Sequence, residues 1–193
     1  MSDVNLQLVR EYLELNQFTV LTRRKYRLTK REVSGDENIV LMAMNLAPVN
    51  TDRPLPITLG PGDITAIRRA AIDVKGWHTD IFSSTIFEIR PNVFGFVSPT
   101  AIEYAEEVFG TSDFARILVI SELPAVADAR AKAESVASER GVDHLLEFPT
   151  MLRGILGMIR TNNNYTESDL LQLMRIMKRY RLVKDTQLEF EFD

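Results

Sequence analysis

The sequence contains no cysteine, one tryptophan and only two histidines, His78 and His144. The lack of cysteine excludes a disulfide framework, a thiolate zinc site and a cysteine nucleophile. Two histidines are too few for a histidine-rich metal site, and they leave little for a Ser-His-Asp triad. No apolar run approaches the roughly 18 residues that a membrane-spanning helix needs. The first residues lack the basic flank and apolar stretch of a secretory signal. We therefore expect a cytoplasmic protein with no membrane partner.

Acidic residues outnumber basic ones, but the positive charge is concentrated. The formal net charge is −4, which by itself disfavours non-specific binding to nucleic acid. Residues 23–31 hold six basic side chains and no acid, and residues 175–184 hold five more. Such runs are most often solvated faces, but they would form a phosphate-facing surface for DNA or RNA if the two segments met in space. The first run consists of Arg23, Arg24, Lys25, Arg27, Lys30 and Arg31.

The length of 193 residues favours a single domain, since a domain averages roughly 150 residues. Hydrophobic periodicity predicts the order helix, three strands, helix, strand, then helix, strand and two helices. The first six elements are typical of an open mixed α/β sheet with helices on its faces, and a proline-rich loop over residues 46–63 interrupts them. Helices are predicted at residues 4–17, 99–110, 126–140, 149–160 and from 166 onward, and strands at 18–28, 38–45, 64–75, 116–121 and 142–148. Residues 79–97, which this order leaves out, are interpreted as a short helix at 82–87 followed by a strand at 92–97.

Two of the predicted helices carry start signals. Pro99 suits the first helical position of one of them, and the alternative there is a capping box formed by Thr100 and Glu103. Thr166 and Asp169 have the spacing of a second capping box. These signals predict where each helix begins, to within a residue or two.

The main candidate for chemistry is the pair Asp73 and Lys75, at the end of a predicted buried strand. Residues two apart in a strand point to the same side, with Cα atoms roughly 6.5–7 Å apart. The carboxylate suits a hard cation such as Mg²⁺ or Mn²⁺, and the ammonium suits an attacking water or a developing phosphoryl charge. The alternative is an ordinary surface acid and lysine, because this spacing is common. Trp77 and His78 follow the pair, and we interpret Trp77 as a packing residue rather than a platform for stacking a base.

The order of elements, together with IDVKGW over residues 72–77 and IVLMAMN over residues 39–45, resembles the PD-(D/E)XK, or restriction-endonuclease-like, nuclease superfamily. The resemblance covers roughly residues 4–121, so that residues 122–193 would be a C-terminal β-α-α elaboration of the single domain 1–193. It implies an α-β-β-β-α-β core and metal-dependent phosphodiester hydrolysis, with Mg²⁺ or Mn²⁺ held between an acid on the second strand and the acid-x-lysine pair. The resemblance gives Asp73 the role of metal ligand and Lys75 that of positioning the water. Glu11 or Glu14 on the first helix would complete such a site.

The second strand departs from that family pattern at one position. Members with a similar strand carry aspartate just after its first apolar residue, where this sequence has Val40. Valine cannot ligate a cation, so the metal site is predicted to be weakened or lost. Three acids are alternatives for the missing ligand. They are Asp36 and Glu37 just before the strand, and Asp63, which would face Asp73 only if residues 64–72 formed a tight hairpin.

Two functions of different class follow from this pattern. The favoured hypothesis is a nuclease-fold protein with an incomplete metal site, which acts as a non-catalytic nucleic-acid-binding or assembly module. The alternative is an active Mg²⁺- or Mn²⁺-dependent nuclease that recruits one of the three acids as the missing ligand. A third hypothesis is an oligomeric scaffold, in which the alternating tail LEFEFD of residues 188–193 adds a strand to a neighbouring subunit.

Overall fold

The computed structural model describes residues 3–22 and 41–183, which form a mixed five-stranded sheet flanked by helices. The strands lie in the order of the chain, from β1 at one edge to β5 at the other. The first three pair as antiparallel neighbours, and the last two join them in parallel. The strands are β1 (Phe18–Thr22), β2 (Leu41–Asn45), β3 (Arg69–Lys75), β4 (Ala115–Ile120) and β5 (His144–Glu147).

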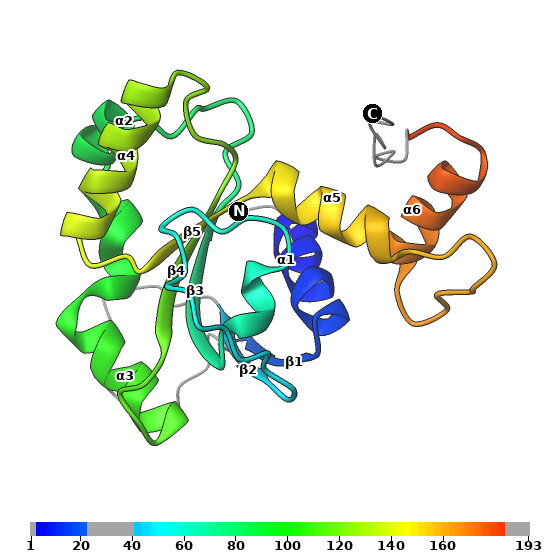
Figure 1. Cartoon of the computed structure of the whole chain (residues 1–193), viewed down its shortest axis with the longest axis horizontal. Helices are drawn as coiled ribbons and strands as arrows, with labels where there is room; N and C mark the ends of the chain where they lie inside the picture. Colours follow the sequence, from blue (N-terminus) through cyan, green and yellow to red (C-terminus); the bar gives the residue numbers. More distant parts are fainter. Residues whose placement is uncertain (1–2, 23–40, 184–193) are drawn as a thin grey trace.

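Helices cover both faces of this sheet (Figure 1). On one face lie α1 (Asp3–Leu15), α5 (Phe148–Met158) and α6 (Asp169–Arg179). On the other face lie α2 (Ser84–Ile89), α3 (Pro99–Phe109) and α4 (Ala127–Glu139), together with a 3-10 segment, Pro91–Val97. In Figure 1, α5 leads away from the sheet and α6 lies at the far end of the molecule. None of the helices in the described parts of the chain is both long and apolar enough to cross a bilayer.

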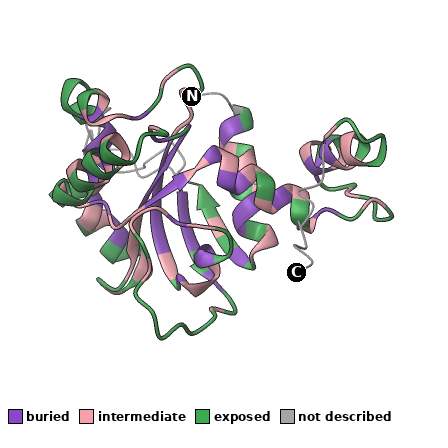
Figure 2. Cartoon of the chain, turned by 45° about the horizontal axis from the view of Figure 1, so that its top comes forward, coloured by how far each residue is buried: buried purple, intermediate pink, exposed green. Residues whose placement is uncertain are grey.

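The sheet separates two hydrophobic cores, because side chains on a strand alternate between its faces. In β3, Ile72 and Val74 belong to the core beneath α1 and α5, whereas Ala71 belongs to the core beneath α3 and α4. The strands β2 to β5 are mostly buried, whereas the edge strand β1 and the outer faces of the helices are largely exposed (Figure 2). Asp73 has the same parity as Ala71 and therefore belongs to the α3 and α4 face.

Two segments that were predicted as strands are not strands. One is the first part of residues 64–75, before β3, and the other is residues 92–97, before α3. The chain turns at Gly62, whose φ is 82°, and Asp63–Ala66 forms a 3-10 turn, so that β3 begins only at Arg69. Residues 92–97 were expected as a strand but lie in the 3-10 segment that Pro91 begins. Proline fixes φ near −65° and lacks a donor for a strand ladder, which favours the first turn of a helix.

The proline-rich residues 46–63 form a loop as predicted, but part of that loop covers the outer edge of the sheet. Thr58 makes an isolated parallel bridge with Leu145 of β5. The Leu145 amide donates to the Ile57 carbonyl at 2.6 Å, and the Leu59 amide donates to the Leu145 carbonyl at 2.9 Å. These bonds occupy the outward backbone groups of Leu145, which would otherwise be an open strand edge.

Serines cap the helices for which threonine capping boxes were considered. Ser98 caps α3 by accepting a hydrogen bond from the Ala101 amide, so that Pro99 takes the first helical position. Ser168 caps α6 by accepting from the Leu171 amide, two residues after the predicted Thr166 cap. In both helices the serine hydroxyl satisfies an amide that has no partner within the helix.

Several sequence predictions lie outside the described residues. These are the six basic residues of 23–31, the acids Asp36 and Glu37, the Val40 position, and the alternating tail over residues 188–193. Of the predicted strands, only Phe18–Thr22 and Leu41–Asn45 are described at this side of the sheet.

Candidate functional site

Asp73 and Lys75 form a buried ion pair at the C-terminal end of β3. The Lys75 Nζ lies 2.8 Å from Asp73 Oδ2, as the shared direction of the two side chains predicted. The other carboxylate oxygen, Oδ1, accepts a hydrogen bond of 2.8 Å from the Val74 amide. The Asp73 side chain is 2% exposed and that of Lys75 is 19% exposed. The surface acid and lysine considered as an alternative are therefore excluded.

Burial raises the pKa of Asp73 above its ordinary value, although the Lys75 ammonium and the Val74 amide act in the opposite direction. Desolvation disfavours the charged carboxylate, and here it outweighs the two favourable contacts. Neither oxygen of Asp73 is free, since one bonds the lysine and the other bonds the backbone. The pair is therefore internally neutralised and shielded from water.

Asn5 of α1 holds the chain that leaves this pair. Its Nδ2 donates to the Gly76 carbonyl at 3.1 Å, and its Oδ1 lies 3.0 Å from His78 Nε2. The approach is so close that a Cβ on Gly76 would lie 2.1 Å from Asn5 Nδ2, which explains the glycine. Sequence reasoning missed Asn5. Its signal was a polar residue at helical spacing from Val9 and Leu13, on the buried face of α1.

Trp77 is a packing residue, as interpreted from the sequence. Its ring stacks on Phe82 with centroids 5.3 Å apart, and the Arg90 guanidinium lies over the ring, 4.6 Å from its centre. Arg90 also pairs with Asp80 at 3.5 Å. These contacts occupy the aromatic surface that a nucleobase would need.

The two glutamates of α1 have partners other than Asp73. Glu11 accepts a hydrogen bond from the Ser168 hydroxyl, which comes from the N-terminus of α6. Glu14 accepts from Arg10 Nε at 2.7 Å, one turn earlier in the same helix. Helix α1 packs on the face of the sheet opposite to Asp73. The structure therefore ties these residues to the α1 and α6 side rather than to the acid-lysine pair.

Asp63 also belongs to the α1 face. Its side chain pairs with Arg53, and it accepts a hydrogen bond of 2.8 Å from the Gly60 amide. Burial and the nearby Asp63 carboxylate raise the pKa of Tyr12, on α1, to about 12. The 3-10 turn that carries Asp63 replaces the hairpin that would have been needed to bring it to Asp73.

The described residues do not fit a divalent cation at Asp73. Mg²⁺ or Mn²⁺ requires several oxygen ligands, usually with waters in the remaining positions. Asp73 offers one carboxylate whose oxygens are both engaged, and residues 3–22 and 41–183 hold no group of three or more His, Asp or Glu that could bind a metal. An ammonium already occupies the place of a counter-ion. We therefore derive no chemical step through a metal.

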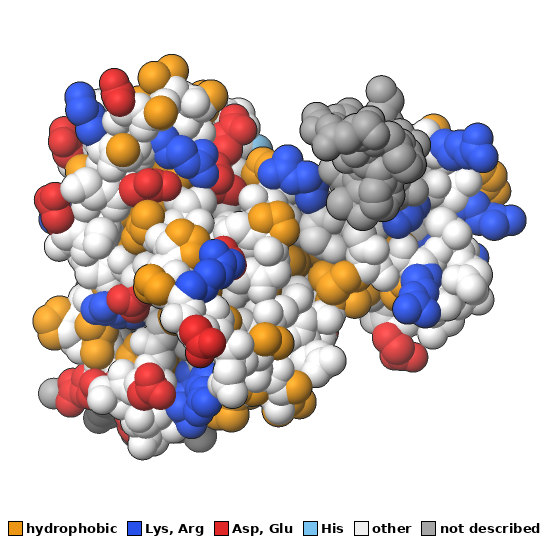
Figure 3. Space-filling model, viewed as in Figure 1, with side chains coloured by type: hydrophobic (Ala, Val, Ile, Leu, Met, Phe, Trp, Pro, Cys, Tyr) orange, Lys and Arg blue, Asp and Glu red, His pale blue; other side chains and the backbone are white. Residues whose placement is uncertain are grey.

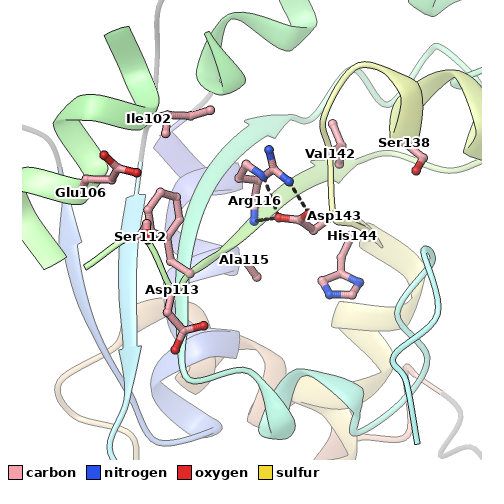
Figure 4. Close-up of a pocket in the computed structure, with 11 residues that line it drawn as sticks. Ile102, Glu106, Ser112, Asp113, Ala115, Arg116, Ser138, Val142, Asp143 and His144 are labelled. Carbon is pink, nitrogen blue, oxygen red and sulfur yellow. Dashed lines mark hydrogen bonds and ion pairs between the residues drawn. The ribbon is translucent and has the colours of Figure 1, made fainter. Parts of the chain in front are cut away.

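A cavity of about 820 Å³ lies at the opposite end of the parallel strands (Figure 4). It opens where β4 and β5 begin, whereas Lys75 ends β3, so it is not part of the acid-lysine site. Arg116 and Asp143 line the cavity as a fork-shaped ion pair, with Nε and Nη2 of the arginine 2.7 and 2.6 Å from the carboxylate oxygens. The other labelled residues in Figure 4 include Glu106, Ser112, Asp113, Ser138 and His144.

The pKa of Asp143, which pairs with Arg116, shifts in the opposite direction to that of Asp73, which pairs with Lys75. Burial alone would raise the pKa of Asp143, but hydrogen bonds from the Arg116 side chain and from its backbone amide outweigh burial and lower it. The same contacts raise the pKa of Arg116. The pair is about one-third exposed and fully ionised at neutral pH.

Part of the second basic run has a structural role. Lys178 Nζ donates to the carbonyls of Leu156 and Ile159, at 2.8 and 3.1 Å, and Arg175 Nε donates to the Thr161 carbonyl at 3.2 Å. These carbonyls lie at or just beyond the end of α5, where the helix provides no partner of its own. The two cations therefore join α6 to the end of α5.

Comparison with known proteins assigns no family to the chain. No protein-family model, curated protein or solved structure matches it. Any proposal for its function therefore rests on the chemistry of its own residues.

Proposed function

We propose that this chain is a nuclease-fold protein of the restriction-endonuclease-like type that binds nucleic acid without cleaving it. The observation that carries the proposal is the buried Asp73–Lys75 ion pair, and within residues 3–22 and 41–183 no group of three or more His, Asp or Glu could hold a metal beside it. The two residue types are those that the resemblance gives to a nuclease site, but they contact each other and are buried as in a structural salt bridge.

The arrangement of the sheet supports the fold part of the proposal. A helix, three antiparallel strands, a helical crossover and a parallel fourth strand occur in the order that the resemblance implies. The acid-x-lysine pair ends the third strand, β3. Residues after Ile120 add α4, β5, α5 and α6.

Two features disfavour catalysis at Asp73: a substrate has little access to its carboxylate, and the described residues hold no group of ligands for a metal. A phosphodiester would have to reach Asp73, whose side chain is 2% exposed. A metal would have to displace Lys75 from Oδ2, and the described residues hold no group of three or more His, Asp or Glu that could offset the loss of that contact. In the sequence, Val40 stands where the resemblance expects an aspartate.

Binding to nucleic acid is supported by the distribution of charge. Over the full sequence, residues 148–193 hold seven basic and six acidic side chains, or +1, whereas residues 1–147 hold sixteen basic and twenty-one acidic ones, or −5. Figure 3 shows Lys and Arg side chains gathered over the α6 end of the molecule, while Asp and Glu are frequent over the rest of that view. A positive region on an otherwise acidic protein attracts a polyanion to one place.

Calorimetric titration with Mn²⁺, followed by binding and cleavage assays on branched, single-stranded and duplex DNA, tests the proposal. We expect no saturable binding of Mn²⁺ at millimolar concentration, no cleavage, and salt-sensitive binding of nucleic acid. Asp73→Asn is the matched variant for the acid-lysine site, and Asp143→Asn is the control at the other end of the sheet. Saturable Mn²⁺ binding that Asp73→Asn abolishes and Asp143→Asn leaves unchanged would overturn the non-catalytic proposal.

An active nuclease is the second candidate, and one observation favours it. The acid and the lysine are in contact at the end of β3, and such buried ion pairs are often no more stabilising than apolar residues of similar volume. Metal-dependent cleavage that is lost in both Asp73→Asn and Lys75→Met would favour this candidate.

A further inference from the structure

Helix α6 has a second apolar stripe, which faces away from the protein. Leu171 and Met174 are buried in the core shared with α1 and α5. Leu173, Ile176 and Tyr180, spaced three and four apart, are 55%, 39% and 71% exposed. Spacing of three and four places these side chains on one face of the helix. A helix that only covered a core would have a polar outer face, so this face is suited to a further contact.

Two exposed arginines lie at the end of this stripe. Arg179 and Arg181 flank Tyr180 and are exposed, and among the described residues neither forms an ion pair with an acid. Arg175 and Lys178, by contrast, are committed to the carbonyls at the end of α5. Of the four cations of this run that the structure describes, two thus fix α6, and the other two are exposed and flank Tyr180 in the sequence.

The turn that ends α6 fixes the position of these residues. The Leu182 amide donates to the Met177 carbonyl at 2.9 Å, and the Arg181 amide donates to the Lys178 carbonyl at 3.1 Å. This is the double hydrogen bond of a Schellman cap, and Arg181 occupies its left-handed position with φ of 57°. Glycine is usual there because a Cβ is disfavoured, so the chain carries an arginine at a position where it costs conformational energy.

We infer that the end of α6 is the nucleic-acid contact of this protein, and that it binds unpaired nucleotides. Arg179 and Arg181 contact phosphates, while Tyr180 stacks on a base and Leu182, 71% exposed, packs beside it. The inference rests on the proposed function, and it adds the location of the binding surface and the preference for a single strand. Bases are accessible for stacking only where they are not already stacked and paired within a duplex.

Charge selects this occupant over a second copy of the chain. The surface is cationic and aromatic together, which matches the alternation of phosphate and base along a single strand. A symmetric dimer through this face would bring Arg179 and Arg181 of both copies into one interface, and such a concentration of like charge is unfavourable. Strand binding and self-association predict different results in solution.

Fluorescence anisotropy with labelled oligonucleotides of about 20 residues tests the inference, because a single-strand site commonly covers about 4–16 nucleotides. The probes are oligo(dT), oligo(U) and a mixed-sequence duplex, each titrated with the full chain. The charge variant is Arg179→Gln with Arg181→Asn, since asparagine tolerates the left-handed backbone of position 181. Tyr180→Ala removes the ring, and Tyr180→Phe retains it.

We expect the wild type to bind both single strands more tightly than the duplex. The charge variant reduces the salt slope of log K by about 1.4, because each phosphate contact on a single strand contributes about 0.7. Tyr180→Ala weakens single-strand binding about tenfold, at the lower end of the range for one stacked base, and Tyr180→Phe restores it. These residues are exposed, so circular dichroism and melting temperature are expected to stay close to those of the wild type.

Lys132→Gln with Arg140→Gln is the matched control. It removes two exposed cations, one on α4 and one at its C-cap, and is expected to leave affinity and salt slope almost unchanged. Equal losses in the two double variants would overturn the inference, because they would indicate non-specific attraction. So would wild-type affinity in the α6 variants, which would leave the proposed function intact but move its binding surface elsewhere.

Failure of the proposed function gives a different pattern. If the wild type binds none of the three probes at low salt, both the nucleic-acid function and the α6 inference fall. If the wild type cleaves DNA with Mn²⁺ while the α6 variants still lose affinity, the non-catalytic proposal falls and the inference stands. A change in sedimentation coefficient in Tyr180→Ala, with no change in oligonucleotide affinity, would assign the surface to self-association instead.

Discussion

Each end of the parallel strands carries an aspartate paired with a cationic side chain, but the pKa of the aspartate is raised at one end and lowered at the other. At the C-terminal end of β3, Asp73 is almost fully buried and its pKa is raised, although Lys75 is in contact with it. At the N-terminal end of β4, Asp143 is half-buried and its pKa is lowered by the Arg116 side chain and amide. The comparison shows that contact with a cation does not by itself decide whether an acid is stabilised in its ionised form.

The geometry of the donors explains the difference. Arg116 meets Asp143 with two parallel side-chain bonds and adds its backbone amide, while the site keeps one-third of its exposure to water. Lys75 offers a single contact to Asp73, whose side chain is almost fully buried. A planar fork satisfies a carboxylate better than a point charge does, and remaining hydration avoids much of the desolvation cost. The partly exposed Arg116–Asp143 pair thus stabilises the fold. In the Asp73–Lys75 pair, the lysine offsets only part of the free energy that burial of the carboxylate costs.

Removal of Lys75 is expected to have the largest effect on this comparison. Lys75→Met leaves the Asp73 carboxylate buried without a counter-charge and should lower the free energy of unfolding by about 3–5 kcal/mol at neutral pH. Urea denaturation measures it. The double variant Asp73→Leu with Lys75→Met is the control and should unfold close to the wild type, since apolar residues often replace a buried pair without loss. A loss below about 1 kcal/mol in the single variant would show that the pair is far more hydrated than its burial indicates.

The close approach of Asn5 to Gly76, just after the buried pair, is tested by Gly76→Ala. Its Cβ would lie 2.1 Å from Asn5 Nδ2, and overpacking of this kind typically costs about 1–3 kcal/mol. Adding Asn5→Ala should recover part of the loss, which a double-mutant cycle measures as a coupling between the two positions. Gly157→Ala on α5 is the control, because nothing lies within 4 Å of its added Cβ, and it should be neutral or slightly stabilising. Additive losses at Asn5 and Gly76 would contradict the close approach.

At the other end of the sheet, Arg116→Ala is expected to cost about 1–2 kcal/mol. The change removes two hydrogen bonds to Asp143, and the residual exposure of both side chains keeps the cost below that of Lys75→Met. Arg10→Ala is the matched control, since Arg10 pairs with Glu14 on an exposed helix face and should cost no more than about 0.5 kcal/mol. Equal costs for the two arginines would mean that the fork at Asp143 adds nothing to stability.

Asp73 and Asp143 should change the pH dependence of the free energy of unfolding in opposite directions. This effect is expected to be the smallest of the four. The folded pKa of Asp73 is raised, so its contribution to stability is present below the unfolded value of about 3.9 and is lost as pH rises through the folded pKa. Asp143 has a lowered pKa, so its contribution is present above that value and is lost as pH falls. Each slope is a fraction of the roughly 1.4 kcal/mol per pH unit that one proton gives.

Urea unfolding of two variants between about pH 3 and 7 measures these slopes, because that window brackets the unfolded value of aspartate. Asp73→Asn should make the change of stability with pH more positive above about pH 4, and Asp143→Asn should make it less positive below about pH 4. Parallel curves for the two variants would show that the two acids do not differ in the direction of their pKa shifts.

The sequence predicted the elements whose patterns are local. The apolar run at residues 116–121 corresponds to β4, an interior strand of the sheet, Pro99 and Gly110 mark the two ends of α3, and residues 46–63 form a loop. The shared direction of Asp73 and Lys75 also followed from the period of a strand. Each of these features depends on a few neighbouring residues, so one sequence contains the information.

The surroundings of the site could not be predicted, because they depend on which faces meet. The spacing of Leu8, Tyr12 and Leu15, with Val4, Val9 and Leu13 nearby, predicted one apolar face for this helix, and the structure buries Val9, Tyr12 and Leu13 most deeply. On the same helix, Glu11 contacts Ser168 of α6, 157 residues away in sequence. Nothing local to α1 indicates that partner, nor that residues 79–97 would cover Asp73 with short helical turns.

The bridge between Thr58 and Leu145 has a consequence for the order in which the protein is made. Its two segments come from the first and last thirds of the chain, and contacts of such long sequence separation form late and slow folding. A growing chain that has β1 to β4 but not yet β5 carries residues 57–59 without their partner and β4 with an unpaired side. During synthesis this intermediate would expose strand edges, and it is the stage at which the protein would most need a chaperone.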